Sequence, residues 1–532
     1  MVIAGSSPLS GGVMKLLFAS QTACSALSLA HETFFKNTSR RWIFNEKDRL
    51  AERYVKFNPT ELQRVAGEAI QDSCPNIVKL AEGGFNKVFL LRSNSGREVI
   101  ARIPTPIAGP AHYTTASEVA TMDFARTLLK LPVPKVLAYS STRDNPVGAE
   151  YIIMDRVDGE SLSSRWHSLT AEELKDVMLQ VVEMEQKVFN HPFPGFGSLY
   201  HKKDLNDEPQ IPVPVEDFCV GPIAGRQFWH GERSQICVDR GPWTSPVDCM
   251  TSAARREAAW IRQHAKAQPR QRFVLPTAHN IDPSEHTSLL SMFLQLAPCL
   301  IPPVSKLNFP ILRHPDLSLG NILLDRNSTK IASIIDWQDT AILPLFVQAG
   351  HPAFCEHDFS KPQPMTLPTL PDNFNELSAE DQLQAKSQRR LELTNLYYTA
   401  LTGLHNKANT EALKIPHFNM RQYLLQQTGY PWDADVINLR AALVGITSPE
   451  VWNSISTSPC TVNFTERERE TAIEEAKEWI ESEEMLSAVR ARLCLDPEGG
   501  TDPENHEWAS NVNTEFRTMM FQQAEEHERE LA

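Results

Sequence analysis

The feature that most constrains this chain is a polar loop flanked by short apolar runs. The loop reads His-Pro-Asp-Leu-Ser-Leu-Gly-Asn from His314 to Asn321, and Asp336 lies fifteen residues after its last residue. Between them, the apolar runs Ile322–Leu324 and Ile331–Ile335 are separated by the polar residues 325–328. Short apolar runs on either side of a turn rich in Asp, Asn and Ser predict two adjacent strands. The segment is therefore expected to form a tight loop followed by two short strands.

These residue types match the requirements of phosphoryl transfer. That reaction needs a carboxylate to accept the proton of the attacking hydroxyl, and oxygen ligands to hold Mg²⁺ against the phosphates. Asp316 can accept the proton, while Asn321 and Asp336 can bind the metal. The alternative is an Asp-x4-Asn turn that arose by chance. The second aspartate at the end of an apolar strand argues against that alternative.

The loop resembles the His-x-Asp-x4-Asn catalytic loop of protein kinases and aminoglycoside phosphotransferases. Its partner Ile335-Asp336-Trp337, where protein kinases have Asp-Phe-Gly, is similar to the aminoglycoside phosphotransferase and choline kinase branch. The resemblance implies that Asp316 is the catalytic base, that Asn321 and Asp336 are the metal ligands, and that His314 supports the loop. It also implies an α+β, two-lobed, protein-kinase-like fold, with a small antiparallel-sheet N-lobe and a larger, mainly helical C-lobe.

The residues upstream show the order of elements that such an N-lobe needs. Hydrophobic periodicity and turn signals predict three strands, one helix and two further strands. A capping-box pattern of Thr115 and Glu118 marks the expected helix start. The predicted elements are strands 77–80, 87–91 and 98–103, a helix over 115–130, and strands 133–139 and 151–154.

By the same resemblance, the first hairpin covers the phosphates of a bound nucleotide. Gly83, Gly84 and Asn86 are the expected contacts, because adjacent glycines let backbone N–H groups approach an anion. The full Gly-x-Gly-x-x-Gly pattern is absent, so an ordinary hairpin turn is the alternative. Asp155 and Val157, after the fifth strand, are expected to bind adenine through their backbone C=O and N–H groups.

Arg102 is a departure from the family pattern. It stands on the third strand, where the family usually carries the lysine that contacts the phosphates. Arginine keeps the positive charge but is longer and planar. Glu118 is its expected partner, and a helix-capping role is the alternative for this glutamate.

The first residues of the chain have the composition of a targeting segment. Residues 1–31 contain no Asp or Glu and are rich in Ser and Ala, with Lys15 as their one base. Such a leader predicts a mitochondrial transit peptide over residues 1–35. A secretory signal and a plain tail are the alternatives. The apolar stretch 13–30 is too interrupted for a membrane span, so no stable span is expected.

The remaining chain divides into four expected regions. A length of 532 residues is too great for one ordinary core. The resemblance is clear over residues 76–350 and looser over 36–450. The expected regions are a helical N-terminal extension over 36–75, the N-lobe over 76–157, the C-lobe over 158–450 with an insertion at about 200–250, and a helical C-terminal extension over 451–532.

Composition excludes several other classes of protein. A net charge of −14 without a basic run argues against nucleic-acid binding. Nine scattered cysteines, none in a Cys-x-x-Cys pair, fit a reducing compartment better than a disulfide framework. His351, Cys355 and His357 are close in sequence, but the second pair of ligands expected of a zinc site is missing.

The order of motifs also resembles the fungal branch described as altered inheritance of mitochondria proteins. Arg41-Trp42, the segment 82–89, the segment 101–104 and the segment 115–121 carry this resemblance. The expected function is transfer of the ATP γ-phosphate, with Mg²⁺, to a hydroxyl of an unidentified small molecule in mitochondria. The alternative is a nucleotide-binding pseudokinase that acts as a mitochondrial scaffold. No protein partner can be named.

Overall fold

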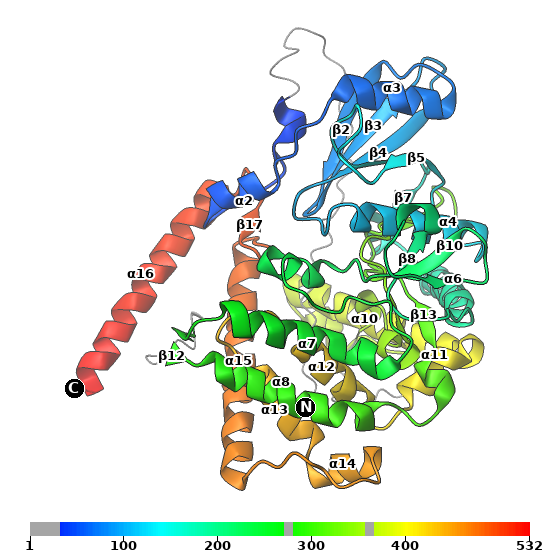
Figure 1. Ribbon diagram of the computed structural model, residues 1–532. Helices are drawn as coiled ribbons and strands as arrows, with labels where there is room; N and C mark the ends of the chain where they lie inside the picture. The colour runs from blue at the N-terminus through cyan, green and yellow to red at the C-terminus, as the bar shows by residue number, and fades with distance from the viewer. Residues whose placement is uncertain (1–31, 271–279, 357–365, 532) are drawn as a thin grey trace. The chain divides into compact units, whose positions relative to one another are not determined.

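The computed structural model describes residues 32–531 except 271–279 and 357–365 (Figure 1). These residues form two compact units. The smaller unit contains residues 32–108, 142–153 and 480–531, and the larger contains residues 109–141 and 154–479.

An antiparallel sheet is the centre of the smaller unit. Strand β2 (Asn76–Glu82) pairs with β3 (Asn86–Arg92), and β3 pairs with β4 (Glu98–Pro104). Strand β6 (Tyr151–Asp155) lies next to β4. Alternate side chains of β3 and β4 point into an apolar core, as the two-residue period of a strand requires. The fully buried members include Phe89, Leu91, Val99, Ala101 and Ile103.

Aromatic side chains from the N-terminal extension complete this core. Helix α3 (Pro59–Ile70) begins with Asn58, whose side chain accepts hydrogen bonds from the first helical N–H groups. Phe57, just before it, packs against Phe89 with ring centroids 5.2 Å apart. Phe35 packs against Phe57 at 5.3 Å and is only 7% exposed. Residues 32–35, the end of the predicted leader, are therefore part of the folded unit, whereas residues 1–31 lie outside the described residues.

A buried carboxylate ties this extension to the first hairpin. The Glu82 side chain, 1% exposed, accepts hydrogen bonds from the Thr38 and Ser39 N–H groups at 2.7 and 3.3 Å. It also pairs with Lys79 at 3.0 Å and with Lys87. Burial alone would raise the pKa of Glu82, but the two ammonium groups outweigh burial and lower it. We call Thr38, Ser39, Glu82, Lys79 and Lys87 the N-terminal clamp.

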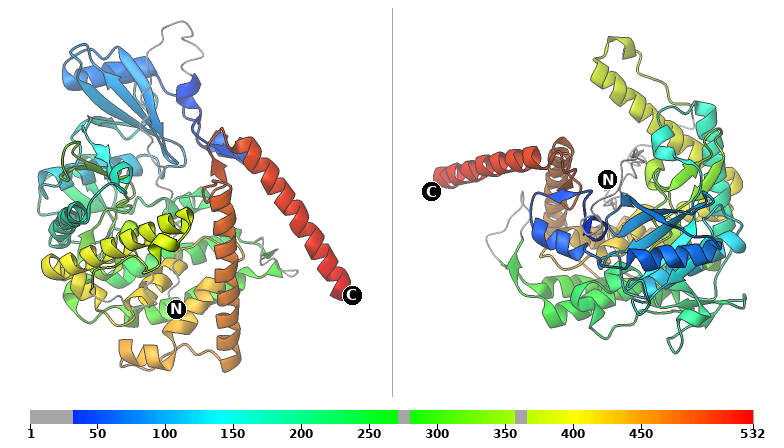
Figure 2. Two further views of the ribbon diagram at one scale, coloured as in Figure 1. Left: turned by 180° about the vertical axis from the view of Figure 1, so that it is seen from behind. Right: turned by 90° about the horizontal axis from the view of Figure 1, so that it is seen from above.

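The smaller unit also joins two segments that are far apart in the sequence. Strand β1 (Arg41–Trp42) pairs antiparallel with β17 (Gly500–Thr501), although the two are far apart in sequence. Arg53, 2% exposed, donates a 2.5 Å hydrogen bond to Glu498 and stacks over Trp42. Helix α2 (Glu46–Glu52) follows β1 in the chain, and helix α16 (His506–Leu531) follows β17. Both views of Figure 2 show α16 as a single long helix.

The larger unit is mainly helical. Helix α6 (Ala171–Phe189) opens with a complete capping box of Thr170 and Glu173. It packs against α10 (Ala379–His405), while α7 (Pro246–His264) packs against α8 (Pro283–Leu300). The other main helices are α4 (Tyr113–Thr127), α11 (Lys407–Leu413), α12 (Phe418–Thr428), α13 (Ile437–Ile446), α14 (Pro449–Ile455) and α15 (Glu466–Arg492), which continues into the smaller unit.

Short strands of the larger unit frame the predicted catalytic loop. Strand β14 (Ile322–Leu324) pairs antiparallel with β15 (Ile331–Ile334) and with β7 (Glu160–Ser161). Strand β13 (Pro310–Leu312), just before the loop, pairs with β16 (Ile342–Pro344), which follows Asp336 in the chain. Both ends of the loop segment are thus fixed by strand pairing, in agreement with the predicted strand-loop-strand pattern.

The insertion near residues 200–250 folds onto the larger unit with its own small sheet. Strands β8 (Ser198–His201), β10 (Phe218–Gly221) and β9 (Ile211–Pro212) are neighbours in that order. The buried aromatic rings of Phe196, Phe228 and Trp243 form a cluster against which Ala341 and Leu343 pack. The insertion is therefore continuous with the core beside β16.

The α+β class and the order of three strands, a helix and two strands are confirmed, with β5 (Val136–Ser140) and β6 after α4. The predicted capping box at Thr115 is wrong. Helix α4 begins two residues earlier, after His112, so that Thr115 and Glu118 both lie within the helix and are buried. Burial of this polar face, which the sequence does not reveal, is the reason for the difference.

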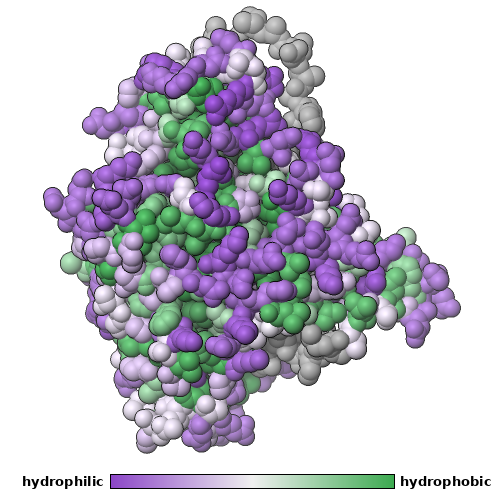
Figure 3. All heavy atoms as spheres, turned by 90° about the vertical axis from the view of Figure 1, so that its right-hand side faces the viewer, coloured by the Kyte–Doolittle hydropathy of each residue, from purple (hydrophilic) through white to green (hydrophobic). Residues whose placement is uncertain are grey.

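Within the described part of the chain, no helix is both long and apolar enough to cross a membrane. Hydrophilic and apolar residues are interspersed on the face that Figure 3 shows. The predicted segment 13–30 lies outside the described residues.

Candidate active site

The histidine of the loop fixes the backbone around it. His314 Nε2 donates to Ile335 O at 3.0 Å, and its Nδ1 accepts a hydrogen bond from the Asp316 N–H at 3.2 Å. This pattern requires a neutral ring with its proton on Nε2. Burial lowers the pKa of His314 to about 4, so the ring stays neutral at physiological pH. The ring also packs edge-on against Trp337, 4.7 Å away. His314 therefore has the supporting role expected of it.

Asn321 closes the loop onto Asp316. Its Nδ2 donates to Asp316 O at 2.9 Å and to Asp316 Oδ2 at 3.2 Å. Because the NH₂ group faces Asp316, the amide oxygen is the atom left to bind a cation. The Asn321 carbonyl also accepts a hydrogen bond from the Ile335 N–H at 3.0 Å. Ile335 is therefore held by both His314 and Asn321, and this brings the next residue, Asp336, to the loop.

The two aspartates differ in environment. Asp316 is half-buried, whereas Asp336 is exposed and has a left-handed backbone with φ of 66°. Burial and then the negative charge of Asp336 raise the pKa of Asp316, against the smaller effect of the Asn321 hydrogen bond. A raised pKa makes Asp316 a better proton acceptor than an ordinary surface aspartate.

A buried ionic cluster, not predicted from the sequence, anchors the loop. Arg313 donates to Glu185 Oε1 through Nε at 3.0 Å and Nη2 at 2.8 Å. The same guanidinium donates to Gln348 O at 2.6 Å and to Gly350 O at 3.0 Å. The Tyr398 hydroxyl donates to Glu185 Oε2. Burial alone would lower the pKa of Arg313, but Glu185 outweighs burial and raises it. A basic residue next to the His-x-Asp motif is the only sequence signal for this cluster.

Two serines hold the other end of the loop. Ser161 Oγ and Ser163 N both donate to Leu319 O, at 3.1 and 3.0 Å. Gly159, just before them, lies so close to β14 that an added Cβ would be 2.8 Å from Leu324 O. The loop between Asp316 and Asn321 is thus fixed from outside as well as from within.

The glycine hairpin belongs to the smaller unit. The Gly83 N–H donates to Asn86 O at 3.0 Å, and Thr105 N donates to Phe85 O at 2.8 Å. A Cβ at Gly84 would meet no atom within 4 Å, and one at Gly83 would meet only Asn86 O at 4.0 Å. Packing of this unit therefore does not explain the two glycines, whereas close approach of a phosphate to the backbone would.

The other predicted nucleotide contacts lie on both units. Arg102 is on β4 and is 7% exposed, while Glu118 is on α4 and is 3% exposed. These two residues belong to different compact units, so their pairing stays a prediction. Asp155 ends β6 and donates its N–H to Lys135 O at 2.9 Å, and Val157 follows in an irregular, half-buried segment. Their contacts with adenine also stay predictions.

The histidines and cysteine that follow the site do not form a metal centre in the described residues. His351 Nε2 contacts Thr399 Oγ1 at 3.0 Å, and Cys355 Sγ lies 3.9 Å from Met178 Sδ. His357 is outside the described residues. In the described ranges, no group of three or more His, Cys, Asp or Glu residues could hold a metal ion.

The α+β fold and the histidine-supported Asp-x4-Asn loop place the chain in the kinase-like class. No protein-family model matches it. Over 490 residues it is 61% identical to a subtelomeric hrmA-associated cluster protein of Aspergillus fumigatus strain CBS 144.89, covering 87% of this chain and 96% of that protein. The chain therefore belongs to the family of subtelomeric hrmA-associated cluster proteins.

A more distant relative carries the name of the fungal branch that the sequence resembles. The chain is 27% identical over 383 residues to the mitochondrial altered inheritance of mitochondria protein 9 of Lachancea thermotolerans, covering 66% of this chain and 60% of that protein. It is also similar to the solved structure of ADP-bound aminoglycoside phosphotransferase APH(2″)-Ib. That similarity has 13% identity and a TM-score of 0.36, and covers 73% of this chain and 97% of the other.

Proposed function

We propose that this protein is an ATP- and Mg²⁺-dependent phosphotransferase acting on a hydroxyl of a small molecule. The observation that carries the proposal is the Asp316–Asn321 pair, closed by hydrogen bonds and brought next to Asp336 through the backbone of Ile335. A chance turn would not need a neutral, buried histidine and a buried ion pair to hold it.

The donor atoms fit Mg²⁺ bound together with a nucleotide. Mg²⁺ prefers oxygen ligands and is usually held by one or two carboxylates plus phosphates, not by a cage made of protein alone. The carboxylate of Asp336 and the amide oxygen of Asn321 are ligands of this kind. When bound, Mg²⁺-ATP supplies the phosphoryl group and the charge that neutralises it.

The three residues of the loop, Asp316, Asn321 and His314, then each have a defined part in the reaction. Asp316 orients the acceptor hydroxyl and takes its proton, which its raised pKa favours. Asn321 keeps the Asp316 carboxylate in place through Nδ2 and offers Oδ1 to the metal. His314, which stays neutral, keeps Asp336 beside the loop and takes no part in proton transfer.

A nucleotide-binding pseudokinase is the second candidate. The specific observations that favour it are Arg102 in the place of the family's usual lysine, and a hairpin with two adjacent glycines in place of the full glycine motif. An intact Asp316–Asn321–Asp336 set is not required of a scaffold, and this favours the enzyme.

The first expected result concerns nucleotide binding. Mg²⁺-ATP at about 100 times its dissociation constant should stabilise the native state by about 2.7 kcal/mol. Melting temperature measured with ATP, with and without EDTA, checks this. No shift at millimolar Mg²⁺-ATP would exclude both the enzyme and the nucleotide-binding scaffold.

The second expected result separates the enzyme from the scaffold. Loss of a charge-assisted contact in Arg102→Ala should weaken ATP binding and transfer together, by about 1.5–3 kcal/mol. In an enzyme adapted to arginine, Arg102→Lys should also lose activity, because a point charge replaces a planar fork. ATP turnover of both variants is the measurement, with Asp316→Ala as the blank. Wild-type turnover no higher than the blank, with a gain in Arg102→Lys, would favour the pseudokinase.

We further propose a mitochondrial location, supported by the acid-free leader and by the name of the similar Lachancea protein. Because Phe35 is buried in the smaller unit, the leader should end before Glu32, slightly earlier than the predicted residue 35. Residues 1–31 fused to a fluorescent reporter are expected to direct it to mitochondria, which microscopy checks. A reporter that remains in the cytosol would refute the location.

A further inference from the structure

The N-terminal clamp contacts the glycine hairpin at its base. Glu82 and Lys87 are the last residues paired between β2 and β3 before the turn that contains Gly83 and Gly84. Their side chains form an ion pair in which they are 1% and 0% exposed. The backbone carbonyl of Glu82 also accepts a hydrogen bond from Ser39 Oγ at 3.3 Å. The clamp therefore holds the residue that directly precedes the two glycines.

Residues 33–39 supply the polar groups that these buried charges need. Two of their N–H groups donate to the carboxylate of the clamp. Lys79 Nζ donates to Thr33 O at 2.9 Å and to Lys36 O at 3.0 Å, and Lys87 Nζ donates to Lys36 O at 3.0 Å. Buried charges are costly unless hydrogen bonds satisfy them. One backbone segment thus satisfies the carboxylate and both ammonium groups.

The clamp and Arg102 lie on opposite faces of the sheet. Residues paired across neighbouring strands point to the same face, and successive residues of one strand alternate between the faces. Lys87 is paired with Ile103, whereas the next residue, Val88, is paired with Arg102. Phe89, two residues after Lys87, packs against the N-terminal extension. The clamp therefore holds the hairpin from the face that the extension covers, and not from the face on which Arg102 lies.

The glycine turn is held on both of its sides. Glycine loses more conformational freedom than other residues when it is ordered, so two adjacent glycines need contacts outside the turn to fix them. The clamp fixes Glu82 on one side. On the other side, the N–H and the hydroxyl of Thr105 donate to Phe85 O at 2.8 and 3.0 Å. Gly83 and Gly84 lie between these two points, so release of either point should reduce the population of the observed turn.

We propose that Glu82 is a positioning residue for nucleotide binding. Together with residues 33–39, it fixes the base of the glycine hairpin in the conformation that receives the phosphates of ATP. This role rests on the nucleotide binding proposed above. A loop that is already ordered binds its ligand more tightly, because less ordering remains to be done on binding. The N-terminal extension then contributes to nucleotide affinity as well as to the core.

The test measures binding of two probes, Mg²⁺-ATP and adenosine, to the full chain by calorimetry. Adenosine lacks the phosphates, so a hairpin that covers phosphates affects the affinity for ATP alone. If Glu82→Gln lowers the population of the competent hairpin to about a tenth, the affinity for Mg²⁺-ATP should fall about tenfold. The affinity for adenosine should change less than about twofold. Equal loss for the two probes, or no loss for ATP, would overturn the proposal.

Glu98→Gln is the matched control. Glu98 is also a carboxylate of this sheet and pairs with Arg92, but it lies at the end of β4 that is distant from the glycine hairpin. Its substitution should change the affinity for either probe less than about twofold. If the wild type did not bind Mg²⁺-ATP, the proposed function would fail and this role with it. If the wild type and Glu82→Gln bound Mg²⁺-ATP equally well, only this role would fail.

A double variant covers the case in which Glu82→Gln does not fold. Glu82→Met with Lys87→Met removes both charges of the buried pair, and such a replacement by apolar side chains of similar size is often neutral for stability. The double variant should keep its melting temperature and still lose about tenfold in affinity for Mg²⁺-ATP, but not for adenosine. Wild-type affinity for Mg²⁺-ATP in the folded double variant would overturn the proposal.

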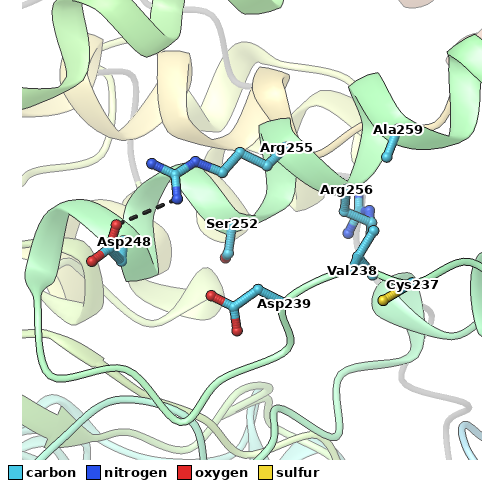
Figure 4. A pocket seen from close by; sticks show the side chains of 8 residues that line it. All are labelled: Cys237, Val238, Asp239, Asp248, Ser252, Arg255, Arg256 and Ala259. Carbon is cyan, nitrogen blue, oxygen red and sulfur yellow. Dashed lines mark hydrogen bonds and ion pairs between the residues drawn. The ribbon is translucent and has the colours of Figure 1, made fainter.

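Nucleotide bound at another place would not depend on the hairpin. In the larger unit, a pocket of about 210 Å³ lies between α7 and residues 237–239 (Figure 4). Ala259→Leu adds volume to the lining of this pocket and favours the helix, so it should leave the affinity for Mg²⁺-ATP unchanged. Loss of Mg²⁺-ATP binding in this variant would place the nucleotide in that pocket and overturn the proposal.

Discussion

Asp316→Asn is expected to lower phosphoryl transfer by about 10²–10⁴-fold, the usual contribution of a general base. Binding of Mg²⁺-ATP should persist, because Asp316 acts on a proton that moves only during the reaction. Asp336→Asn should instead lose metal-dependent binding, because Asp336 balances charge that is already present in the ground state. Turnover and ATP affinity of both variants are the measurements. Equal loss of ATP affinity in the two variants would contradict these roles.

Stability gives an independent check of the Asp316 assignment. Its pKa is raised in the folded protein, so ionisation of this carboxylate opposes folding at any pH above its folded pKa. Asp316→Asn removes that opposition and should raise the melting temperature at neutral pH, but not at a pH low enough to protonate the carboxylate. A loss of activity with a gain in stability is typical of a catalytic group and not of a structural one.

Arg313→Leu is expected to destabilise the protein by about 3–5 kcal/mol, the usual effect of leaving one buried charge without its partner. Glu185 would remain buried with only the Tyr398 hydroxyl to balance it. The double variant Arg313→Leu, Glu185→Leu should recover part of the loss, because no unpaired charge then remains. Urea unfolding of the single and double variants measures this.

An exposed arginine with two glutamate partners provides the control for this experiment. Arg64 contacts Glu61 and Glu68 along the exposed face of α3, so Arg64→Leu should leave the unfolding midpoint unchanged. If Arg313→Leu behaved like Arg64→Leu, the buried cluster would not be what holds the predicted catalytic loop.

The parts of the site that could be predicted are those coded by neighbouring residues. The loop from His314 to Asn321 and the strands that follow it are formed by neighbouring residues. The spacing of the polar residues and the apolar runs were therefore sufficient to predict them. A Thr followed three residues later by Glu does form a capping box at the start of α6. At Thr115 the same pattern failed, because burial of α4, not its cap, decides where those side chains lie.

The parts that could not be predicted depend on residues distant in sequence. Glu185, Arg313 and Tyr398 come from three separate segments, and none has a local pattern that identifies its partners. No local pattern identifies Glu82 as the centre of the N-terminal clamp.

The pairing of β1 with β17 has a consequence for how the protein is made. Trp42 leaves the ribosome 458 residues before its partner Gly500. At 5–20 residues per second this is a delay of about 20–90 s. During that time Trp42 and Arg53, both buried in the finished protein, have no partner strand and no Glu498 to contact. The smaller unit can thus be completed only after residues 498–501 have been synthesised. A truncated protein that ends at Arg492 would lack the strand with which β1 pairs.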